Sequence, residues 1–280
     1  MRKFNRATQA KRQPVSGYKP IIYSCALDNG LNAASIINDA PIVFDDVSLE
    51  RTWRPENYSE KFFGPTRLRE GIVKSRNLVS IRVLQRMGVR NGRDHILKFG
   101  FNPDDVPANL SISLGTPNVP VIDMSQAYAT FANGGYAIEP YLIERIHDQG
   151  GEMVFQHSGP EVCETCPEIS LEDVEAAKRH IDEQPGFIDH SLTPAETDSL
   201  LPEVAEDDEE VISGEIIVAP RAISAENQFI IETFMKDVVT RGTGTKALVL
   251  ERKDLAGKTG TANDQKDTWF NGYQRHVVTN

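Results

Sequence analysis

A serine and a lysine stand three residues apart in the segment RQPVSGYKPIIYSCALDNG, residues 12–30. A mostly apolar, buried helix is expected to begin near Ser16, with Pro20 in its first turn and Gly30 at a left-handed cap. Because helix positions i and i+3 share one face, the Ser16 hydroxyl and the Lys19 amine should come within hydrogen-bonding reach. Serine becomes an effective nucleophile beside a base, and Lys19 can be that base if burial and neighbouring cations lower its pKa. The pair therefore predicts acyl transfer.

Two later motifs supply further polar side chains. KSRN places Ser75 and Asn77 at a junction between two expected helices, and GKTGT places residues 257–261 on an expected strand. Each motif alone has a structural explanation, with the serine and asparagine as helix caps and the lysines as surface charges. The ordered set of S-x-x-K, an S-D-N type triplet and K-T-G is far more specific. It is the catalytic set of penicillin-binding proteins and class A β-lactamases.

The sequence resembles the transpeptidase domain of a class A, bifunctional penicillin-binding protein of Gram-negative type. The resemblance extends over most of the chain, in residues 3–14, 54–77, 113–140, 241–248 and 254–273. It implies a mixed α/β (α+β) fold of the penicillin-binding transpeptidase and serine β-lactamase type, with an antiparallel sheet flanked by helices. It also implies that two strands of this sheet precede Lys3 and that a last strand and helix follow Asn280. A membrane anchor and a glycosyltransferase domain are expected further upstream in the parent protein.

The resemblance also implies catalytic roles. Ser16 attacks a carbonyl carbon, and Lys19 removes the serine proton. Ser75 relays a proton from Lys19 or Lys258 to the leaving amine, and Asn77 holds the substrate amide and orients Lys19. The implied reaction is D,D-transpeptidation of peptidoglycan stem peptides, in which the last D-alanine leaves and an amine of a neighbouring stem accepts the acyl group. β-Lactam antibiotics are expected to acylate the same serine, and the reaction uses no metal or organic cofactor.

Binding roles follow from the same resemblance. The backbone N–H groups of Ser16 and Thr261 match the family's oxyanion hole, where the loss of one donor typically costs about 100- to 1,000-fold in rate. Lys258, Thr259 and Thr261 suit a terminal carboxylate, the lysine as a charge and the threonines as hydrogen-bond donors. Gly260 is expected to let the substrate approach the strand closely.

Three other interpretations stay open. The first is a catalytically inactive fragment, because the expected terminal strands and the glycosyltransferase domain are not in this sequence. Val15 also departs from the glycine that the family usually has before the serine, and a β-branched residue is expected to crowd the turn or the cleft. The second is a β-lactamase, although no E-x-x-L-N type segment stands in the expected region. The third is a D,D-carboxypeptidase.

Composition and charge argue against other classes of protein. The 280 residues carry a formal net charge of −11, which argues against nucleic-acid binding because that affinity comes mainly from Lys and Arg on phosphates. No stretch reaches the roughly 20 apolar residues of a membrane-spanning helix, and the basic start lacks the apolar core of a secretory signal. The parent protein is therefore expected at the periplasmic face of the inner membrane, where the substrate lies, held there by the upstream anchor.

One domain is expected over residues 1–280, interrupted by an acidic, mobile insert at about residues 157–212. Cys163 and Cys166 lie in that insert, and the three cysteines of the chain are too few for a disulfide scaffold. This pair could form a redox pair, half of a zinc site or a local disulfide.

Hydrophobic periodicity and turn residues predict the remaining elements. Helices are expected at residues 66–75, 78–88, 91–100, 120–135 and 224–244, a β-hairpin at 141–156, and two strands joined by a turn at 254–264 and 267–279. The residues up to Gln13 are expected to be the end of a strand or a loop. Residues 38–65 are expected to be an ordered loop region.

Overall fold

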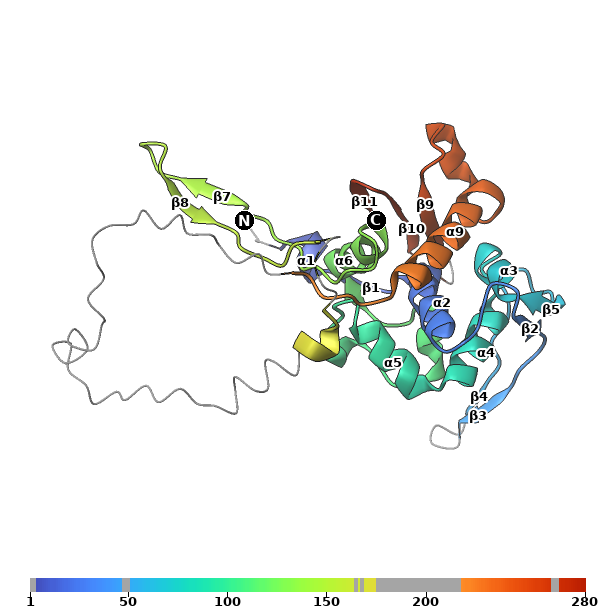
Figure 1. The fold of residues 1–280 in the computed structure, drawn as a ribbon. Helices are drawn as coiled ribbons and strands as arrows, with labels where there is room; N and C mark the ends of the chain where they lie inside the picture. The colour runs from blue at the N-terminus through green and yellow to red at the C-terminus, as the bar shows by residue number, and fades with distance from the viewer. Residues whose placement is uncertain (1–3, 47–50, 164–165, 167–168, 175–217, 263–266) are drawn as a thin grey trace, which may run out of the picture.

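The buried centre of the fold is the helix that follows Ser16 (Figure 1). The structure is a computed structural model and describes residues 4–46, 51–163, 166, 169–174, 218–262 and 267–280. A short 3-10 helix, η1 (Val15–Tyr18), leads into α2 (Lys19–Asp28). Four helices pack around α2, namely α3 (Leu68–Val73), α4 (Asn77–Met87), α5 (Val89–Leu97) and α9 (Ala225–Arg241). This packing buries every residue of α2 from Lys19 to Ala26, as its apolar sequence predicts.

A three-stranded antiparallel sheet lies against this helical core, in the order β11-β10-β9. Its strands are β9 (Ala256–Thr261), β10 (Thr268–Gln274) and β11 (Val277–Thr279). Helix α9 packs on β9, and α6 (Val121–Ala132) packs on β10 and β11. The expected antiparallel sheet flanked by helices is therefore confirmed. The expected single strand at 267–279 is corrected to two strands, because the chain turns back between Gln274 and Val277.

The expected helices at 120–135 and 224–244 are confirmed as α6 and α9. Ser224 caps α9 by accepting a hydrogen bond from the backbone N–H of Asn227 at 3.2 Å. The helix expected from residue 66 begins later, at Leu68, because residues up to Arg67 belong to a strand. The hairpin expected at 141–156 is confirmed as β7 (Arg145–His147) and β8 (Met153–Gln156), which extend away from the core in Figure 1.

Two segments differ from their expected structure, although the strand end expected before Gln13 is present as β1 (Lys11–Arg12). The start of the chain contains a helical turn, α1 (Arg6–Gln9), because the Asn5 side chain accepts a hydrogen bond from the N–H of Ala7. Residues 38–65 include parts of two strand pairs. The short strands are β1 (Lys11–Arg12) with β6 (Val119–Pro120), β2 (Ile36–Asp39) with β5 (Gly64–Arg67), and β3 (Phe44–Asp46) with β4 (Arg51–Trp53). Such short strands form because segments far apart in the sequence pair with each other, so hydrophobic periodicity alone does not predict them.

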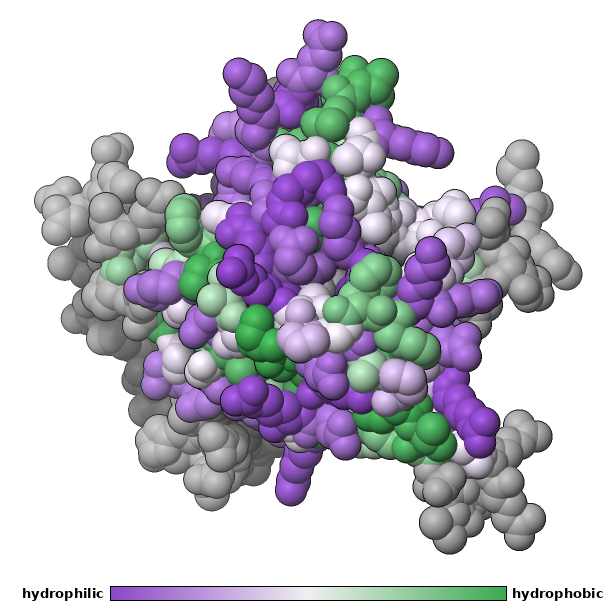
Figure 2. Space-filling view, turned by 90° about the vertical axis from the view of Figure 1, so that its right-hand side faces the viewer, coloured by the Kyte–Doolittle hydropathy of each residue, from purple (hydrophilic) through white to green (hydrophobic). Residues whose placement is uncertain are grey.

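In the described part of the chain, three more 3-10 helices connect the main elements. They are η2 (Pro103–Asp105), η3 (Leu110–Leu114) and η4 (Thr245–Leu250). Within the described residues no helix is long and apolar enough to cross a membrane. Figure 2 shows that the face on the side of α3 and β5 is mainly hydrophilic, with hydrophobic residues in separate small patches.

The predicted mobility of the acidic insert falls mostly on residues 175–217, which lie outside the described residues. The first part of the insert is described, and its backbone is bound to a residue that follows the insert, since the N–H of Ala219 donates to the Glu161 carbonyl at 2.8 Å. Of the three possibilities for its cysteines, the local disulfide is the one found. It joins Cys163 to Cys166, whose Cα atoms are 5.4 Å apart.

Candidate active site

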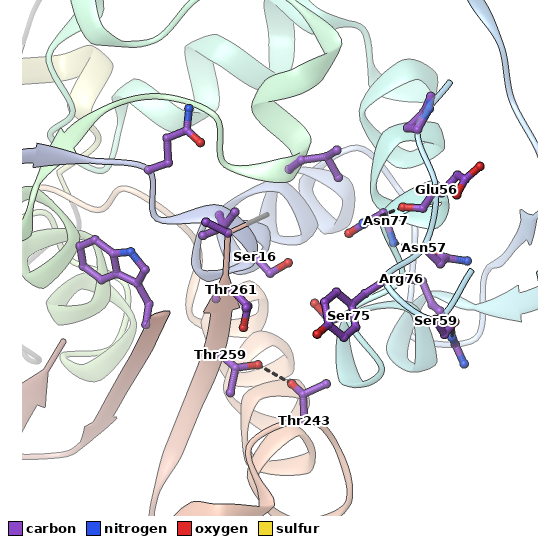
Figure 3. Close-up of a pocket in the computed structure, with 18 of the residues that line it drawn as sticks. Ser16, Glu56, Asn57, Ser59, Ser75, Arg76, Asn77, Thr243, Thr259 and Thr261 are labelled. Carbon is purple, nitrogen blue, oxygen red and sulfur yellow. Dashed lines mark hydrogen bonds between the residues drawn. The ribbon is translucent and has the colours of Figure 1, made fainter. Parts of the chain in front are cut away.

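The three motifs meet in one cleft, which has a volume of about 1220 Å³. Its walls come from η1, the end of β9, the junction between α3 and α4, and the loop after β4. Figure 3 shows Ser16 between Thr261 on one side and the segment with Ser75 and Asn77 on the other. The structure therefore brings together residues from positions 16, 75–77 and 259–261 of the chain.

Ser16 lies in η1 and not at the start of an α-helix, which corrects the expected position of the helix start. A 3-10 helix has three residues per turn, so Ser16 and Lys19 still follow each other by one turn. The expected hydrogen bond between them is not made, and the Ser16 hydroxyl has no hydrogen-bond partner among the described residues. The Lys19 amine instead binds the second motif, KSRN, at Ser75 and Asn77.

Lys19 is fully buried and bound by the segment between α3 and α4. Its Nζ donates to the Ser75 carbonyl oxygen at 2.9 Å, to Ser75 Oγ at 3.4 Å and to Asn77 Oδ1 at 2.7 Å. Burial, reinforced by the nearby charge of Lys258, lowers the pKa of Lys19 well below its ordinary value. The predicted environment of this lysine, buried and beside another cation, is therefore present.

Lys258 approaches Ser75 from the opposite element, β9. Its Nζ donates to Ser75 Oγ at 2.9 Å and to the Thr259 carbonyl at 3.0 Å. It is fully buried, and burial lowers its pKa from 10.5 to about 7. Neither lysine is a surface charge, so that structural explanation of the motifs is wrong. The Ser75 hydroxyl lies within reach of two amines that lose their protons more readily than ordinary lysines.

The backbone N–H of Thr261 points away from the neighbouring strand. Thr261 pairs with Thr268 in the β9–β10 register, and the next residue, Ala262, donates its N–H to the Asp267 carbonyl at 2.9 Å. Because the N–H groups of successive residues in an antiparallel strand point to opposite sides, that of Thr261 faces the open edge of β9. The N–H of Ser16 lies in the first turn of η1, where the helix offers it no acceptor. Both groups are free to bind an anion in the cleft.

Gly260 has a packing role that was not predicted. A Cβ at this position would lie 2.5 Å from the Pro14 carbonyl oxygen and 3.2 Å from the Gly17 backbone nitrogen. The backbone around η1 therefore approaches β9 closely at Gly260, and the expected close approach of a substrate stays a prediction. Glycine here lets the strand end and the Ser16 turn lie directly against each other.

Val15 holds a strained backbone immediately before Ser16. Its φ is +47°, in the left-handed region that β-branched residues disfavour. Its N–H donates to the Gly115 carbonyl at 3.0 Å, and the Val15 carbonyl occupies the space that a Cβ on Gly115 would need. The crowding expected from valine therefore falls on the backbone of the turn.

Among the cleft residues that were not predicted from the sequence, Thr243 and Asn57 bind residues of the motifs. Thr243, after α9, shares a hydrogen bond of 2.6 Å with the Thr259 hydroxyl. Asn57, in the loop after β4, accepts a hydrogen bond from the backbone N–H of Asn77 at 2.8 Å. Neither belongs to one of the three motifs, and no spacing rule connects them to the site. Within the described ranges, no group of three or more His, Cys, Asp and Glu residues could hold a metal ion.

The fold is that of the penicillin-binding transpeptidases. The crystal structure of penicillin-binding protein 1A from Haemophilus influenzae superposes with a TM-score of 0.78 at 32% sequence identity, over 97% of this chain and 38% of that one. PonA1 from Mycobacterium tuberculosis, in complex with penicillin V, shares the fold with a TM-score of 0.64 at 17% identity, over 99% of this chain and 61% of that one. Together with the cleft, this fold defines the class expected from the three motifs.

The chain belongs to the family described as penicillin-binding protein transpeptidase domain, whose model matches residues 2–185 and 211–277. It is similar to penicillin-binding protein 1A of Pseudomonas aeruginosa, with 45% identity over 276 residues, and to that of Vibrio cholerae, with 36% identity over 287 residues. Both matches cover 99% of this chain, but 33% and 30% of those proteins. The expected class A transpeptidase domain is thus confirmed, and the chain spans about a third of the length of these curated relatives.

Proposed function

We propose that this chain carries the acyl-transfer site of a peptidoglycan D,D-transpeptidase that β-lactam antibiotics also acylate. The observation that carries the proposal is the Ser75 hydroxyl, 3.4 Å from Lys19 Nζ and 2.9 Å from Lys258 Nζ, in the cleft that Ser16 lines. A hydroxyl between two buried amines of lowered pKa can pass a proton from one side of the cleft to the other. Such a path is what acyl transfer from an amide to an amine requires.

In the first half of the proposed reaction, Ser16 Oγ bonds to the penultimate D-alanine carbonyl carbon and its proton passes to neutral Lys19. The N–H groups of Ser16 and Thr261 stabilise the resulting oxyanion. Collapse of this intermediate breaks the peptide C–N bond, and the leaving D-alanine amine receives a proton through Ser75. Asn77 holds the substrate amide and keeps Lys19 oriented. The product is an ester of the shortened stem peptide on Ser16.

In the second half, the amine of a neighbouring stem attacks this ester. Its proton returns through Lys19 to Ser16 Oγ as the ester bond breaks, so that a new peptide bond forms and the serine is regenerated. A β-lactam follows the first half only, because its leaving nitrogen stays attached to the opened ring and blocks the acceptor. The penicillin V complex of PonA1 supports binding of this ligand class by the fold.

The substrate carboxylate is proposed to bind at the end of β9. Thr259 and Thr261 offer hydroxyl groups, Lys258 adds positive charge when protonated, and Thr243 orients Thr259 through their shared hydrogen bond. The parent protein is proposed to act at the periplasmic face of the inner membrane. The disulfide between Cys163 and Cys166 supports an oxidising compartment.

The test is the release of D-alanine from a pentapeptide stem that ends in D-Ala-D-Ala, with and without an amine acceptor. We expect acceptor-dependent release that Ser16→Ala abolishes, whereas Ser35→Ala, in a loop outside the cleft, leaves it unchanged. Release that needs no acceptor would indicate a D,D-carboxypeptidase, and rapid turnover of penicillin would indicate a β-lactamase. A folded protein that neither releases D-alanine nor reacts with penicillin would contradict the proposal and indicate an inactive fragment.

A further inference from the structure

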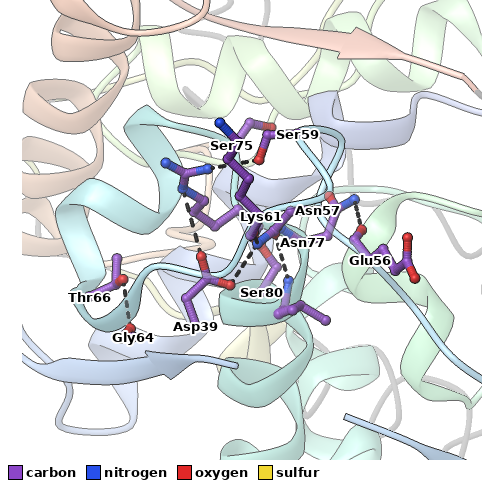
Figure 4. Close-up of polar contacts among 12 residues, drawn as sticks. Asp39, Glu56, Asn57, Ser59, Lys61, Gly64, Thr66, Ser75, Asn77 and Ser80 are labelled. Atoms are coloured by element: carbon purple, nitrogen blue, oxygen red, sulfur yellow. Dashed lines mark hydrogen bonds and ion pairs between the residues drawn. The ribbon is translucent and has the colours of Figure 1, made fainter. Parts of the chain in front are cut away.

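The loop after β4 packs against the segment with Ser75 and Asn77 (Figure 4). Asn57 in this loop is only 4% exposed, and its Oδ1 accepts from the backbone N–H of Asn77 at 2.8 Å and of Leu78 at 3.4 Å. These are the first two N–H groups of α4, which have no partner inside the helix. Arg76, at the N-cap position, makes no side-chain cap hydrogen bond. Asn57 therefore caps α4 from a distant part of the chain.

The amide of Asn57 is fixed in orientation by its other end. Its Nδ2 donates to Asp39 Oδ1 at 2.8 Å and to the Lys61 carbonyl at 2.9 Å. Asp39, at the end of β2, is fully buried, and its Oδ2 faces Arg76 Nε at 3.8 Å. A buried carboxylate is stable only with such partners. Asp39 therefore ties together the loop, through Asn57, and the second motif, through Arg76.

The second motif needs this support because its backbone is strained. Ser75 has a φ of +56°, in the left-handed region that residues other than glycine disfavour. Buried Lys19 binds the carbonyl of Ser75 and the side-chain oxygen of Asn77. The carbonyl of Glu56 accepts from the other end of the Asn77 amide, Nδ2, at 2.8 Å. The segment is thus held between Lys19 and the loop with Glu56 and Asn57.

We propose that Asn57, backed by Asp39, is a positioning residue for the acylation of Ser16. It acts through Asn77, keeping the Asn77 side chain on Lys19 and the Ser75 hydroxyl between the two lysines. The expected effect on activity rests on the function proposed above. The placement itself rests on the contacts of buried side chains with the N-terminus of α4.

An exchange of the two side chains tests the proposal. Asn57→Asp keeps an acceptor for the two N–H groups of α4 but sets a second carboxylate against Asp39. We expect the rate of acylation by penicillin to fall about 100-fold, because a displacement of about 1 Å at a catalytic group can cost that much. Adding Asp39→Asn restores a donor and an acceptor between the two side chains with their roles reversed, but the Lys61 carbonyl still faces a carboxylate, so part of the rate is expected to return. The matched control is Asn91→Asp, whose side chain binds Asn29 outside the cleft.

The pH profile separates positioning from a purely structural role. In Asn57→Ala, which adds no charge, a loosened segment admits water to Lys19 and raises its pKa, so the acidic limb of the acylation profile should move to higher pH. The charged groups that face this region are Lys258 from β9, with Asp39 and Arg76 behind the segment. A loss of rate in proportion to a loss of folded protein, with an unmoved limb, would overturn the proposal. So would a double variant no faster than Asn57→Asp.

A second measurement tests the positioning role of Asn57 without an activity assay. NMR titration of 13C-labelled lysine side chains reports the pKa of Lys19 in the protein alone. We expect a higher value in Asn57→Ala than in the unsubstituted protein. If the unsubstituted protein does not react with penicillin, the proposed function fails, and this titration still decides the positioning role. An unchanged Lys19 pKa in Asn57→Ala would overturn it.

Discussion

At the scale of single residues, strained backbone lies next to the reactive groups. Val15, with φ +47°, directly precedes Ser16, and Ser75, with φ +56°, lies between the two lysines. Such conformations persist only where surrounding contacts hold them, and they concentrate at functional sites. The contacts are identified in both cases: the Gly115 backbone binds Val15, and Lys19 binds the carbonyl of Ser75.

Val15→Gly is expected to raise the free energy of unfolding by about 1 kcal/mol. Glycine adopts positive φ without a Cβ penalty, and this gain exceeds the entropy that an additional glycine costs on folding. Denaturant unfolding measures the change. The matched control is Val277→Gly in β11, an exposed valine without positive φ, which is expected to lower the stability. A loss of stability in Val15→Gly would show that the left-handed turn is not strained.

Lys258 is expected to make stability depend on pH. Burial lowers its pKa from 10.5 to about 7, so between these values the unfolded chain binds a proton that the folded chain does not. Stability should therefore rise as the pH rises from about 7 toward 10, by up to about 1.4 kcal/mol per pH unit. Below pH 7 the lysine is charged in both states, and its contribution is at its least favourable.

Lys258→Met removes this contribution, because methionine fills a similar space without a charge. Unfolding in urea at pH 7 and pH 9.5 should give a smaller rise in stability for the variant than for the unsubstituted protein. Equal rises in both proteins would mean that Lys258 keeps its proton when buried. Because the charge of Lys258 also helps to lower the pKa of Lys19, the pKa of Lys19 is less depressed in the variant, and the difference between the two rises reports both lysines together.

At the scale of elements, the contact between η1 and β9 aligns the nucleophile with the strand edge. Gly260→Ala would place a methyl group 2.5 Å from the Pro14 carbonyl oxygen, which is backbone and cannot turn aside. We expect a stability loss of about 1–3 kcal/mol and a loss of penicillin acylation, because η1 and β9 must separate. Gly150→Ala is the control, since its nearest neighbour is the Asp148 side chain at 3.3 Å. Unchanged acylation in Gly260→Ala would show that this contact does not align the site.

The sequence reveals those elements that local pattern determines. Periodicity predicts α6 and α9, and the apolar run after Lys19 predicts the buried α2. The short strands β2 to β5 are not predicted, because each has only three or four residues and long-range packing determines which strand it pairs with. The same limit applies to the site. Its three motifs are recognisable by spacing, whereas Asn57 and Thr243 join it only through tertiary contacts with Asn77 and Thr259.

At the scale of the whole molecule, a helical core and an antiparallel sheet bring distant motifs to one cleft. The Ser16 turn, the Ser75–Asn77 segment and the end of β9 come from the beginning, the first third and the end of the chain. The disulfide between Cys163 and Cys166 lies outside the residues that line the cleft. The family match extends over both sides of the insert, so the cleft depends on the assembled domain and not on one local segment.

The most direct measurement is covalent labelling of the purified chain with a fluorescent penicillin, followed by mass spectrometry of the labelled peptide. We expect one stable adduct on Ser16, which Ser16→Ala removes while circular dichroism shows that the variant remains folded. An adduct on another residue would contradict the assignment of Ser16 as the nucleophile. No adduct on a sample that is demonstrably folded would contradict the proposal that this cleft performs acyl transfer.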